Sequence, residues 1–156
     1  MEEQSIIAKK AADLLAKRPH FRRELELKLL KKNYSEEAIK EVLDNFEKRS
    51  YLDDRSCAFL YIEELRRKRF GKYEIIRRLI ARGVKESTAK EITSTISLEN
   101  DEREHIRYLL NKRKFNLKDP KGLKKALDFF IRRGFTSSII REIFRSAGSG
   151  GLEGED

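Results

Sequence analysis

The sequence predicts an all-α protein made of three tandem three-helix repeats, which form an elongated, curved array of right or left hand. A shift of about 50 residues brings three similar segments into register, "LLKKNYSEEAIKEVL", "LIARGVKESTAKEIT" and "FIRRGFTSSIIREIF". Each segment carries apolar residues at helical spacing on both sides of a turn, and strand patterns are absent. The predicted repeats span 1–51, 52–98 and 99–147, and a disordered Gly-rich, acidic tail follows at 148–156.

Each repeat is expected to open with an amphipathic helix, at about 5–17, 54–69 and 101–114. In the second of these helices, one face carries Ala58, Phe59, Ile62 and Leu65, which we expect to be buried. This first helix is then followed by two more helices in every repeat.

The second and third helices of each repeat flank a tight turn at Asn33, Gly83 or Gly134. Asn and Gly tolerate the left-handed conformation that ends a helix, and the bulky residue after each one can fold back onto the last turn. Counted from that bulky residue, apolar positions recur nine and five residues before it and eight after it. These positions are Leu25, Leu29 and Val42 in the first repeat, Ile75, Leu79 and Ile92 in the second, and Ala126, Phe130 and Ile143 in the third.

The third repeat carries an additional "NLKDP" after Phe115. In that stretch Asp119 suits an N-cap, and Pro120 suits the first helical position because its missing N–H would have no partner there. The insertion is therefore expected to lengthen a loop and to leave the unit intact.

The neighbouring acids Asp53 and Asp54 are compatible with two roles, capping the start of a helix or binding a catalytic metal. A carboxylate at a helix start accepts backbone N–H bonds and meets the positive end of the helix dipole. A two-metal nuclease needs further converging acids, and Glu63 and Glu64 lie about 15 Å along the helix at about 1.5 Å per residue. We therefore expect capping, and keep an enzyme that acts on nucleic acid as the less favoured alternative.

The sequence lacks the residues that other classes of enzyme and metal site require. The pair Gly71-Lys72 is not a phosphate-binding loop, because the partner glycine and the hydroxyl residue are missing. One cysteine, Cys57, forms no internal disulfide, and with only His20 and His105 it cannot build a zinc cage. All three are expected to be structural. We predict no catalytic residue, no metal, no cofactor and no membrane span, in a cytoplasmic protein.

Basic charge dominates the last two thirds of the chain. The sequence has 36 Lys and Arg against 27 Asp and Glu, which leaves a net charge of +9. Residues 61–83 hold 8 basic and 3 acidic residues, and 103–133 hold 11 and 3. Such a surface favours a polyanionic partner, although a solvated helix face is the ordinary alternative for any single cluster.

The candidate contact residues for this partner lie in those two segments. We expect Phe70, Phe115, Phe130 and Phe135 to be core, and Tyr73 and Tyr108 to be the aromatic contacts. Reversing the charge of exposed basic residues near the ends of the first helices is expected to weaken partner binding without unfolding. The predicted contact set is Arg66, Arg67, Arg69, Lys72, Tyr73, Arg77, Arg78, Lys112, Arg113, Lys114, Arg132 and Arg133.

These segments resemble the RecX family, modulators of the RecA recombinase. Most specific is "YLDDRSCAFLYIEELRRKRFGKYEIIRRLIARGV", and "RRELELKLLKKNY" and "KKALDFFIRRGF" resemble the first and third repeats of the family. Asn33, where the family usually has Gly, the "NLKDP" stretch and the tail depart from the pattern.

The resemblance implies a monomer that is not an enzyme. It would lie in the groove of a RecA filament on single- or double-stranded DNA and inhibit the ATPase, strand exchange and co-protease activities in DNA repair and the SOS response. A general DNA-binding helical array that uses phosphate contacts alone is the alternative.

Overall fold

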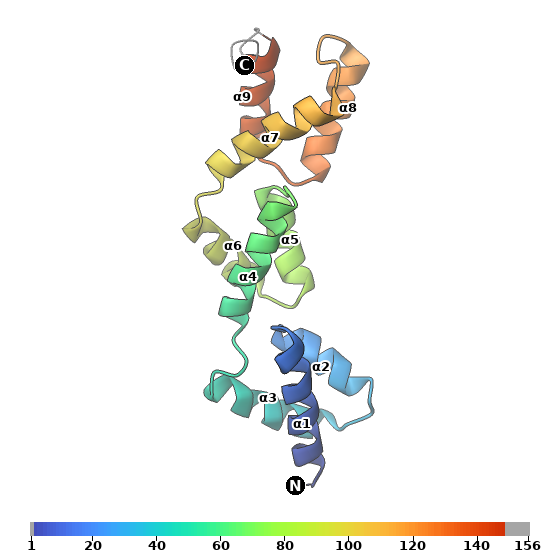
Figure 1. Ribbon diagram of the computed structural model, residues 1–156, viewed down its shortest axis with the longest axis vertical. Coiled ribbons are helices and arrows are strands. Elements are labelled where there is room, and N and C mark those ends of the chain that lie inside the picture. Colours follow the sequence, from blue (N-terminus) through green and yellow to red (C-terminus); the bar gives the residue numbers. More distant parts are fainter. Residues whose placement is uncertain (1, 149–156) are drawn as a thin grey trace. The chain divides into compact units, whose positions relative to one another are not determined.

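The computed structural model describes residues 2–148, and all regular secondary structure in that stretch is α-helical (Figure 1). The helices follow one another as three triplets, which agrees with the predicted all-α repeat array. They are α1 (Glu2–Lys17), α2 (Arg22–Leu30), α3 (Glu36–Lys48), α4 (Asp54–Arg67), α5 (Lys72–Ala81), α6 (Glu86–Thr95), α7 (Glu99–Arg113), α8 (Pro120–Arg132) and α9 (Ser137–Gly148).

The predicted boundaries at 51/52 and 98/99 remain a proposal. Gly148 ends α9 and so belongs to a helix, whereas the remainder of the predicted tail, 149–156, lies outside the described residues. Within the described residues the chain forms two compact units, one of 2–61 with 79–92 and the other of 62–78 with 93–148.

The core of the first unit lies between α1, α2 and α3, which contact one another pairwise (Figure 1). Ile7 and Ala11 of α1 and Leu25 and Leu29 of α2 are fully buried, and they pack with the apolar face of α3. The helical spacing that predicted Leu25 and Leu29 as core positions is thereby confirmed.

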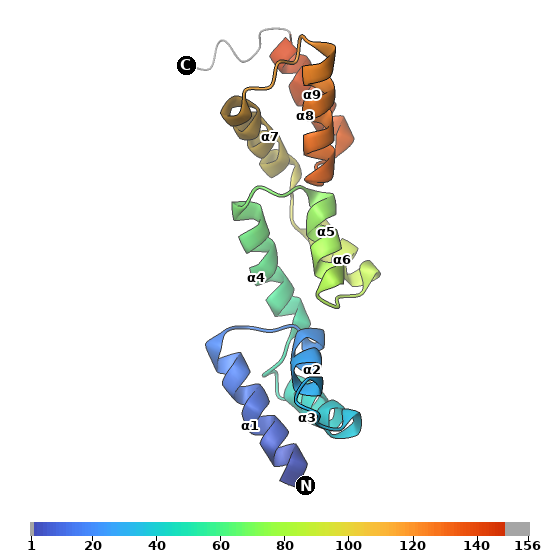
Figure 2. The same cartoon turned by 90° about the vertical axis from the view of Figure 1, so that its right-hand side faces the viewer.

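The core of the second unit lies between α7, α8 and α9 (Figure 2). In it, Phe130, Phe135 and Phe144 pack with aliphatic side chains of the three helices. Phe130 is fully buried and lies at its centre. Its ring centroid is 5.0 Å from that of Phe129 and 5.7 Å from those of Phe135 and Phe144. Phe130 and Phe135 are therefore core residues, as predicted.

The three turns have the left-handed backbone that their sequence predicts. The φ angles are 63° at Asn33, 98° at Gly83 and 88° at Gly134. After the two glycines, the backbone N–H groups of Val84 and Phe135 donate back across the turn, each over 3.1 Å, and both side chains are buried. This geometry is the helix-ending motif in which an apolar residue covers the last turn.

The two neighbouring aspartates cap two different helices. The Asp53 carboxylate accepts hydrogen bonds from the N–H groups of Arg55 and Ser56 at 3.1 and 3.2 Å, so it caps α4 as predicted. The Asp54 carboxylate instead accepts the backbone N–H of Arg22 at 2.7 Å, at the start of α2. The expectation that both serve their own helix is therefore wrong for Asp54, because its side chain points across to α2.

Three predicted core phenylalanines are placed differently. Ala58, Ile62 and Leu65 are fully buried, but Phe59 is 36% exposed, with the guanidinium of Arg55 5.9 Å from its ring centroid. Residue 59 lies about 100° around the helix from residue 58, which turns it out of the buried stripe. Phe70 and Phe115 are also only half-buried, and both line a cavity.

Candidate anion-binding surface

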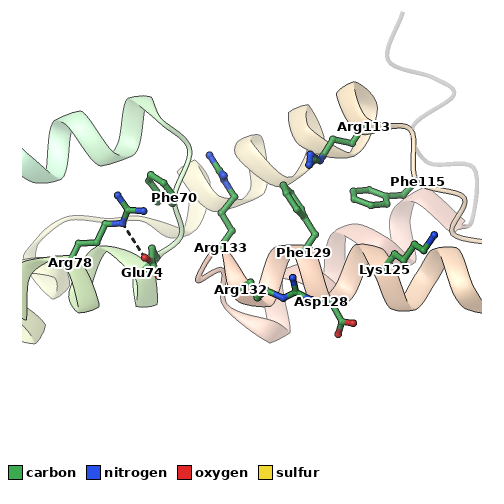
Figure 3. A pocket seen from close by; sticks show the side chains of 10 residues that line it. All are labelled: Phe70, Glu74, Arg78, Arg113, Phe115, Lys125, Asp128, Phe129, Arg132 and Arg133. Carbon is green, nitrogen blue, oxygen red and sulfur yellow. Dashed lines mark hydrogen bonds and ion pairs between the residues drawn. The ribbon is translucent and has the colours of Figure 1, made fainter. Parts of the chain in front are cut away.

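The second unit contains an open cavity of about 780 Å³ that brings together the end of α4, the start of α5, the end of α7 and one face of α8 (Figure 3). Both basic segments of the sequence contribute to it. The lining residues are Phe70, Glu74, Arg78, Arg113, Phe115, Lys125, Asp128, Phe129, Arg132 and Arg133.

Arginines and phenylalanines alternate along this cavity (Figure 3). The guanidinium carbons of Arg78 and Arg133 lie 4.0 and 4.5 Å from the ring centroid of Phe70. The guanidinium of Arg113 lies 4.3 Å from the centroid of Phe129. These distances are those of cation–π stacking, which holds each guanidinium against a ring and favours one orientation. We call this arrangement the Arg–Phe ladder.

Backbone hydrogen bonds join the two sides of the cavity. The N–H groups of Gly71 and Tyr73 donate to the carbonyls of Arg133 and Gly134, each over 2.9 Å. A Cβ on Gly71 would lie 2.3 Å from the backbone nitrogen of Phe135, so only glycine allows this approach. The start of α5 is therefore held directly against the end of α8.

Some hydrogen-bond donors of the Arg133 side chain are engaged within the protein. Its Nε donates to the carbonyl oxygen of Arg69 over 2.7 Å, and one Nη donates to the carbonyl of Lys68, so it caps the end of α4. Burial, followed by the nearby positive charges of Arg113 and Arg78, lowers its pKa. The side chain therefore combines a structural role with a place in the ladder.

The cavity lining has an excess of positive charge, with five cationic side chains against two carboxylates. One of these carboxylates, Glu74, already accepts hydrogen bonds from arginines of the protein. Burial opposes its ionisation, but hydrogen bonds from Arg77 and Arg78 outweigh burial and lower its pKa. In the described part of the chain Arg113, Lys125 and Arg132 form no ion pair. These three cations line the cavity without a carboxylate partner among residues 2–148.

Beside the cavity, a smaller stack lies on α7. The guanidinium carbon of Arg69 is 3.8 Å from the ring centroid of Tyr108, and Lys112 Nζ is 5.7 Å from it. Tyr108 is 43% exposed and Tyr73 is 50% exposed, so both remain available as contact residues, as predicted.

The prediction that the basic residues near the end of α4 are exposed is wrong for Arg66, Arg69 and Lys72, which are half-buried. Arg66 pairs with Glu63 at 2.6 Å and with Asp101, and the hydrogen bond with Asp101 is the main cause that raises its pKa. Arg69 has a φ of 61° and lies under Tyr108. The contacts with Asp101 and Tyr108 are made with residues more than 30 positions away, which a local pattern does not reveal.

Of the remaining predicted contact residues, Arg78 and Arg133 are half-buried and the others are exposed. Arg67, Lys112 and Lys114 project from the ends of α4 and α7, and Lys114 ends α7 with a φ of 52°. Arg77 and Arg132 are also exposed, and an Nη of Arg77 donates to the carbonyl of Arg132 over 3.3 Å. The predicted set therefore lies on the second unit, and Arg78, Arg113, Arg132 and Arg133 of that set line the cavity.

Comparison with known proteins places this arrangement in a family. Residues 9–46 match the first three-helix domain of RecX. The regulatory protein RecX of Chlorobium phaeobacteroides (strain BS1) is 36% identical over 149 residues, which covers 88% of this chain and 96% of that protein. The chain belongs to the RecX family.

A second RecX regulatory protein, from Chlorobium limicola, is 34% identical over 137 residues, which covers 85% of this chain and 83% of that protein. The crystal structure of RecX from Lactobacillus salivarius superposes with a TM-score of 0.80 at 18% identity, over 93% of this chain and 96% of that one. This likeness confirms the fold. The RecX relatives are named as regulatory proteins and not as enzymes.

The side chains that most resemble catalytic groups are structural in this RecX-family chain. His20 is 3% exposed, its Nδ1 is 2.9 Å from the carbonyl oxygen of Arg18, and burial is the main cause that lowers its pKa. Burial raises the pKa of the Cys57 thiol to about 11, which keeps it a neutral thiol. Among residues 2–148 no group of three His, Cys, Asp or Glu side chains is placed to hold a metal.

No helix in the described stretch has the length and apolar character needed to cross a membrane.

Sequence reasoning missed one buried acid, Glu102, which is 3% exposed. Its carboxylate accepts the N–H and the hydroxyl of Thr136 and also the backbone N–H of Lys72. It therefore joins α7 to the starts of α9 and α5. The available signal was its position four residues before the buried Ile106, in the apolar stripe of α7.

Proposed function

We propose that this RecX-family chain is a non-enzymatic regulator that binds the RecA–DNA filament and inhibits its ATPase, strand exchange and co-protease activities in DNA repair and the SOS response. The observation that supports it is the gathering of two basic segments, 61–83 and 103–133, around one cavity with unpaired cations in its lining. A groove that carries DNA phosphates or acidic side chains attracts such a surface. We further propose that the chain acts as a monomer in the cytoplasm, where these filaments form.

The test is the ATPase of RecA on single-stranded DNA, titrated with this protein. We expect inhibition near stoichiometric protein, and weaker inhibition by the double variant Arg113→Glu, Arg132→Glu. The matched control is Lys48→Glu, Arg49→Glu, which reverses two exposed charges in the first unit. An unchanged ATPase and unchanged strand exchange with wild-type protein would rule out filament regulation.

The unpaired cations also fit the alternative, a DNA-binding helical array that contacts phosphates alone. Phosphate contacts make log affinity fall with log salt, by about 0.9 per contact on duplex DNA. Filament binding should add a term that depends less on salt. A filament affinity with the same salt slope as naked DNA would favour the alternative.

A further inference from the structure

We propose that the Arg–Phe cavity is a binding site for a nucleoside phosphate, with the phosphates on its guanidinium groups and the base against Phe115. This assignment goes beyond filament regulation, because it concerns a discrete ligand site on the free protein. It does not depend on RecA being the partner.

The cationic part of the cavity lining includes three guanidinium groups with donors available to a phosphate, those of Arg78, Arg113 and Arg132. Arg113 and Arg132 are exposed and form no ion pair within residues 2–148. Arg78 uses its Nε for Glu74 over 3.0 Å, so its Nη groups remain for a ligand. A guanidinium offers a planar fork of donors that matches a phosphate with two parallel hydrogen bonds.

Stacking in the Arg–Phe ladder also orders the guanidinium groups before a ligand binds. Stacking at 4.0 Å on Phe70 and at 4.3 Å on Phe129 restricts the rotamers of Arg78 and Arg113. Less side-chain entropy is then lost when a phosphate binds than for a free surface arginine. What distinguishes the cavity is that several stacked guanidinium groups line one hollow.

The base side of the site is formed by Phe115. Of the three phenylalanines that line the cavity, Phe70 and Phe129 carry guanidinium groups over their rings, whereas no cation lies over Phe115 in the described part of the chain. Phe115 is half-buried, and its ring is held by Phe129 and Phe130 at centroid distances of 5.7 and 6.2 Å. A fixed, partly exposed ring is a stacking platform for a base of any sequence.

Size and composition favour a nucleotide over an acidic peptide. The cavity of about 780 Å³ lies within the usual range for small-ligand sites, about 300 to 1,000 Å³. Carboxylates of a peptide would satisfy the arginines but would make no use of the Phe115 ring. A free nucleoside triphosphate and an unpaired nucleotide of a single strand share this chemistry, since both present phosphates next to a base.

The test is equilibrium dialysis of the whole chain without RecA, at low and physiological salt. The probes are ATP, inorganic tripolyphosphate, a 15-nucleotide oligo-dT and a Glu-rich peptide. We expect saturable binding of ATP or of the oligonucleotide, and weaker binding of tripolyphosphate than of ATP if the free nucleotide is the ligand. Oligo-dT binding with no ATP binding would identify the strand as the source, and ATP binding would identify the free nucleotide.

The decisive variant is Arg113→Gln, Arg132→Gln, because both side chains are exposed and their replacement should leave the fold intact. We expect it to bind the nucleotide probe at least about tenfold more weakly, as for the loss of charge-assisted hydrogen bonds. The matched control, Lys48→Gln, Arg49→Gln, removes the same charge from exposed positions in the first unit and should bind like wild type. Phe115→Leu should reduce ATP affinity toward that of tripolyphosphate, with thermal melting used to check that it folds.

Several results would overturn the assignment. They are the absence of saturable binding of both ATP and oligo-dT, wild-type affinity in the Arg113, Arg132 variant, and a Glu-rich peptide that binds as tightly as the nucleotide probe. Because RecA is absent, failure here leaves the filament ATPase result untouched, and loss of filament inhibition leaves this binding result untouched.

Discussion

The Glu102 carboxylate accepts two hydrogen bonds from Thr136, from its N–H at 2.9 Å and from its hydroxyl at 2.7 Å. Thr136 directly precedes α9, so an acid of α7 satisfies a helix start that its own sequence leaves open. In the first unit Asp54 of α4 does the same for Arg22 at the start of α2. Carboxylates from the first helix of a triplet, buried at Glu102 and half-buried at Asp54, thus hold the starts of distant helices.

Glu102→Ala should lower the free energy of unfolding by about 3 kcal/mol, because buried donors of Thr136 and Lys72 lose their acceptor. Urea denaturation followed by circular dichroism measures the change. The matched control is Glu104→Ala, an exposed acid on the same helix, which should stay close to wild type. Equal stabilities of the two variants would remove the capping role of Glu102.

The buried acids also predict how stability varies with pH. Burial is the main cause that raises the pKa of Glu102 in the folded protein above its ordinary value of 4.5. The native state therefore holds this proton more tightly than the unfolded state, and its contribution to stability is lost as pH rises through the folded pKa. Relative to the Glu102→Gln variant, wild type should lose unfolding free energy as the pH rises above 4.5. A shift of one pKa unit corresponds to about 1.4 kcal/mol of stability. A stability difference between the two proteins that stayed constant from pH 4 to pH 7 would therefore contradict this prediction.

Asp53→Ala should lower stability by about 1 kcal/mol through loss of the α4 cap, while Asp53→Asn should be milder because an amide oxygen still accepts the N–H bonds. Hydrogen bonds from Ser56 lower the pKa of Asp53, so its stabilising effect should be present above pH 3.8 and lost on acidification. DNA incubated with wild type and divalent metal should remain intact. Cleavage that Asp53→Asn abolished would restore the enzymatic alternative.

Gly134→Val should destabilise by more than about 1 kcal/mol, because φ is 88° and a Cβ would lie 2.2 Å from the backbone nitrogen of Glu74. Gly83→Val should also destabilise, because φ is 98° and the added atom would lie 2.4 Å from the Cβ of Arg23. Asn33→Gly is the control, since glycine accepts the same left-handed backbone. Thermal melting that ranked Asn33→Gly as the most harmful of the three would contradict the turn assignment.

Arg66→Glu should lower stability by about 1 kcal/mol or more, because Glu63 and Asp101 would then face a like charge. The triple variant Lys112→Glu, Arg113→Glu, Lys114→Glu should keep its fold, since these side chains are exposed. Melting temperatures of the two proteins separate a structural arginine from a contact surface. Equal melting temperatures would show that the Arg66 pairs contribute nothing.

Features that depend on neighbours along the chain could be predicted without the structure. Helical spacing identified buried positions such as Leu29, Leu79 and Phe130, because a period of about 3.6 residues places them on one face. Asn33, Gly83 and Gly134 identified the turns, and Asp119 with Pro120 identified the start of α8, because these residue types have local backbone preferences. The concentration of basic charge in two segments was also readable from composition.

Which distant groups meet depends on how the helices pack, and this could not be predicted from local patterns. The Arg–Phe ladder joins Phe70 and Arg78 to Arg113 and Arg133, and no local pattern states that α5 is held by backbone hydrogen bonds against the end of α8. The same packing converts Arg66 from an expected contact into an ion-paired residue. The charge of a segment follows directly from its residues. Whether each charged side chain is available to a partner depends on its burial and its ion pairs, and these are set by neighbours in three dimensions.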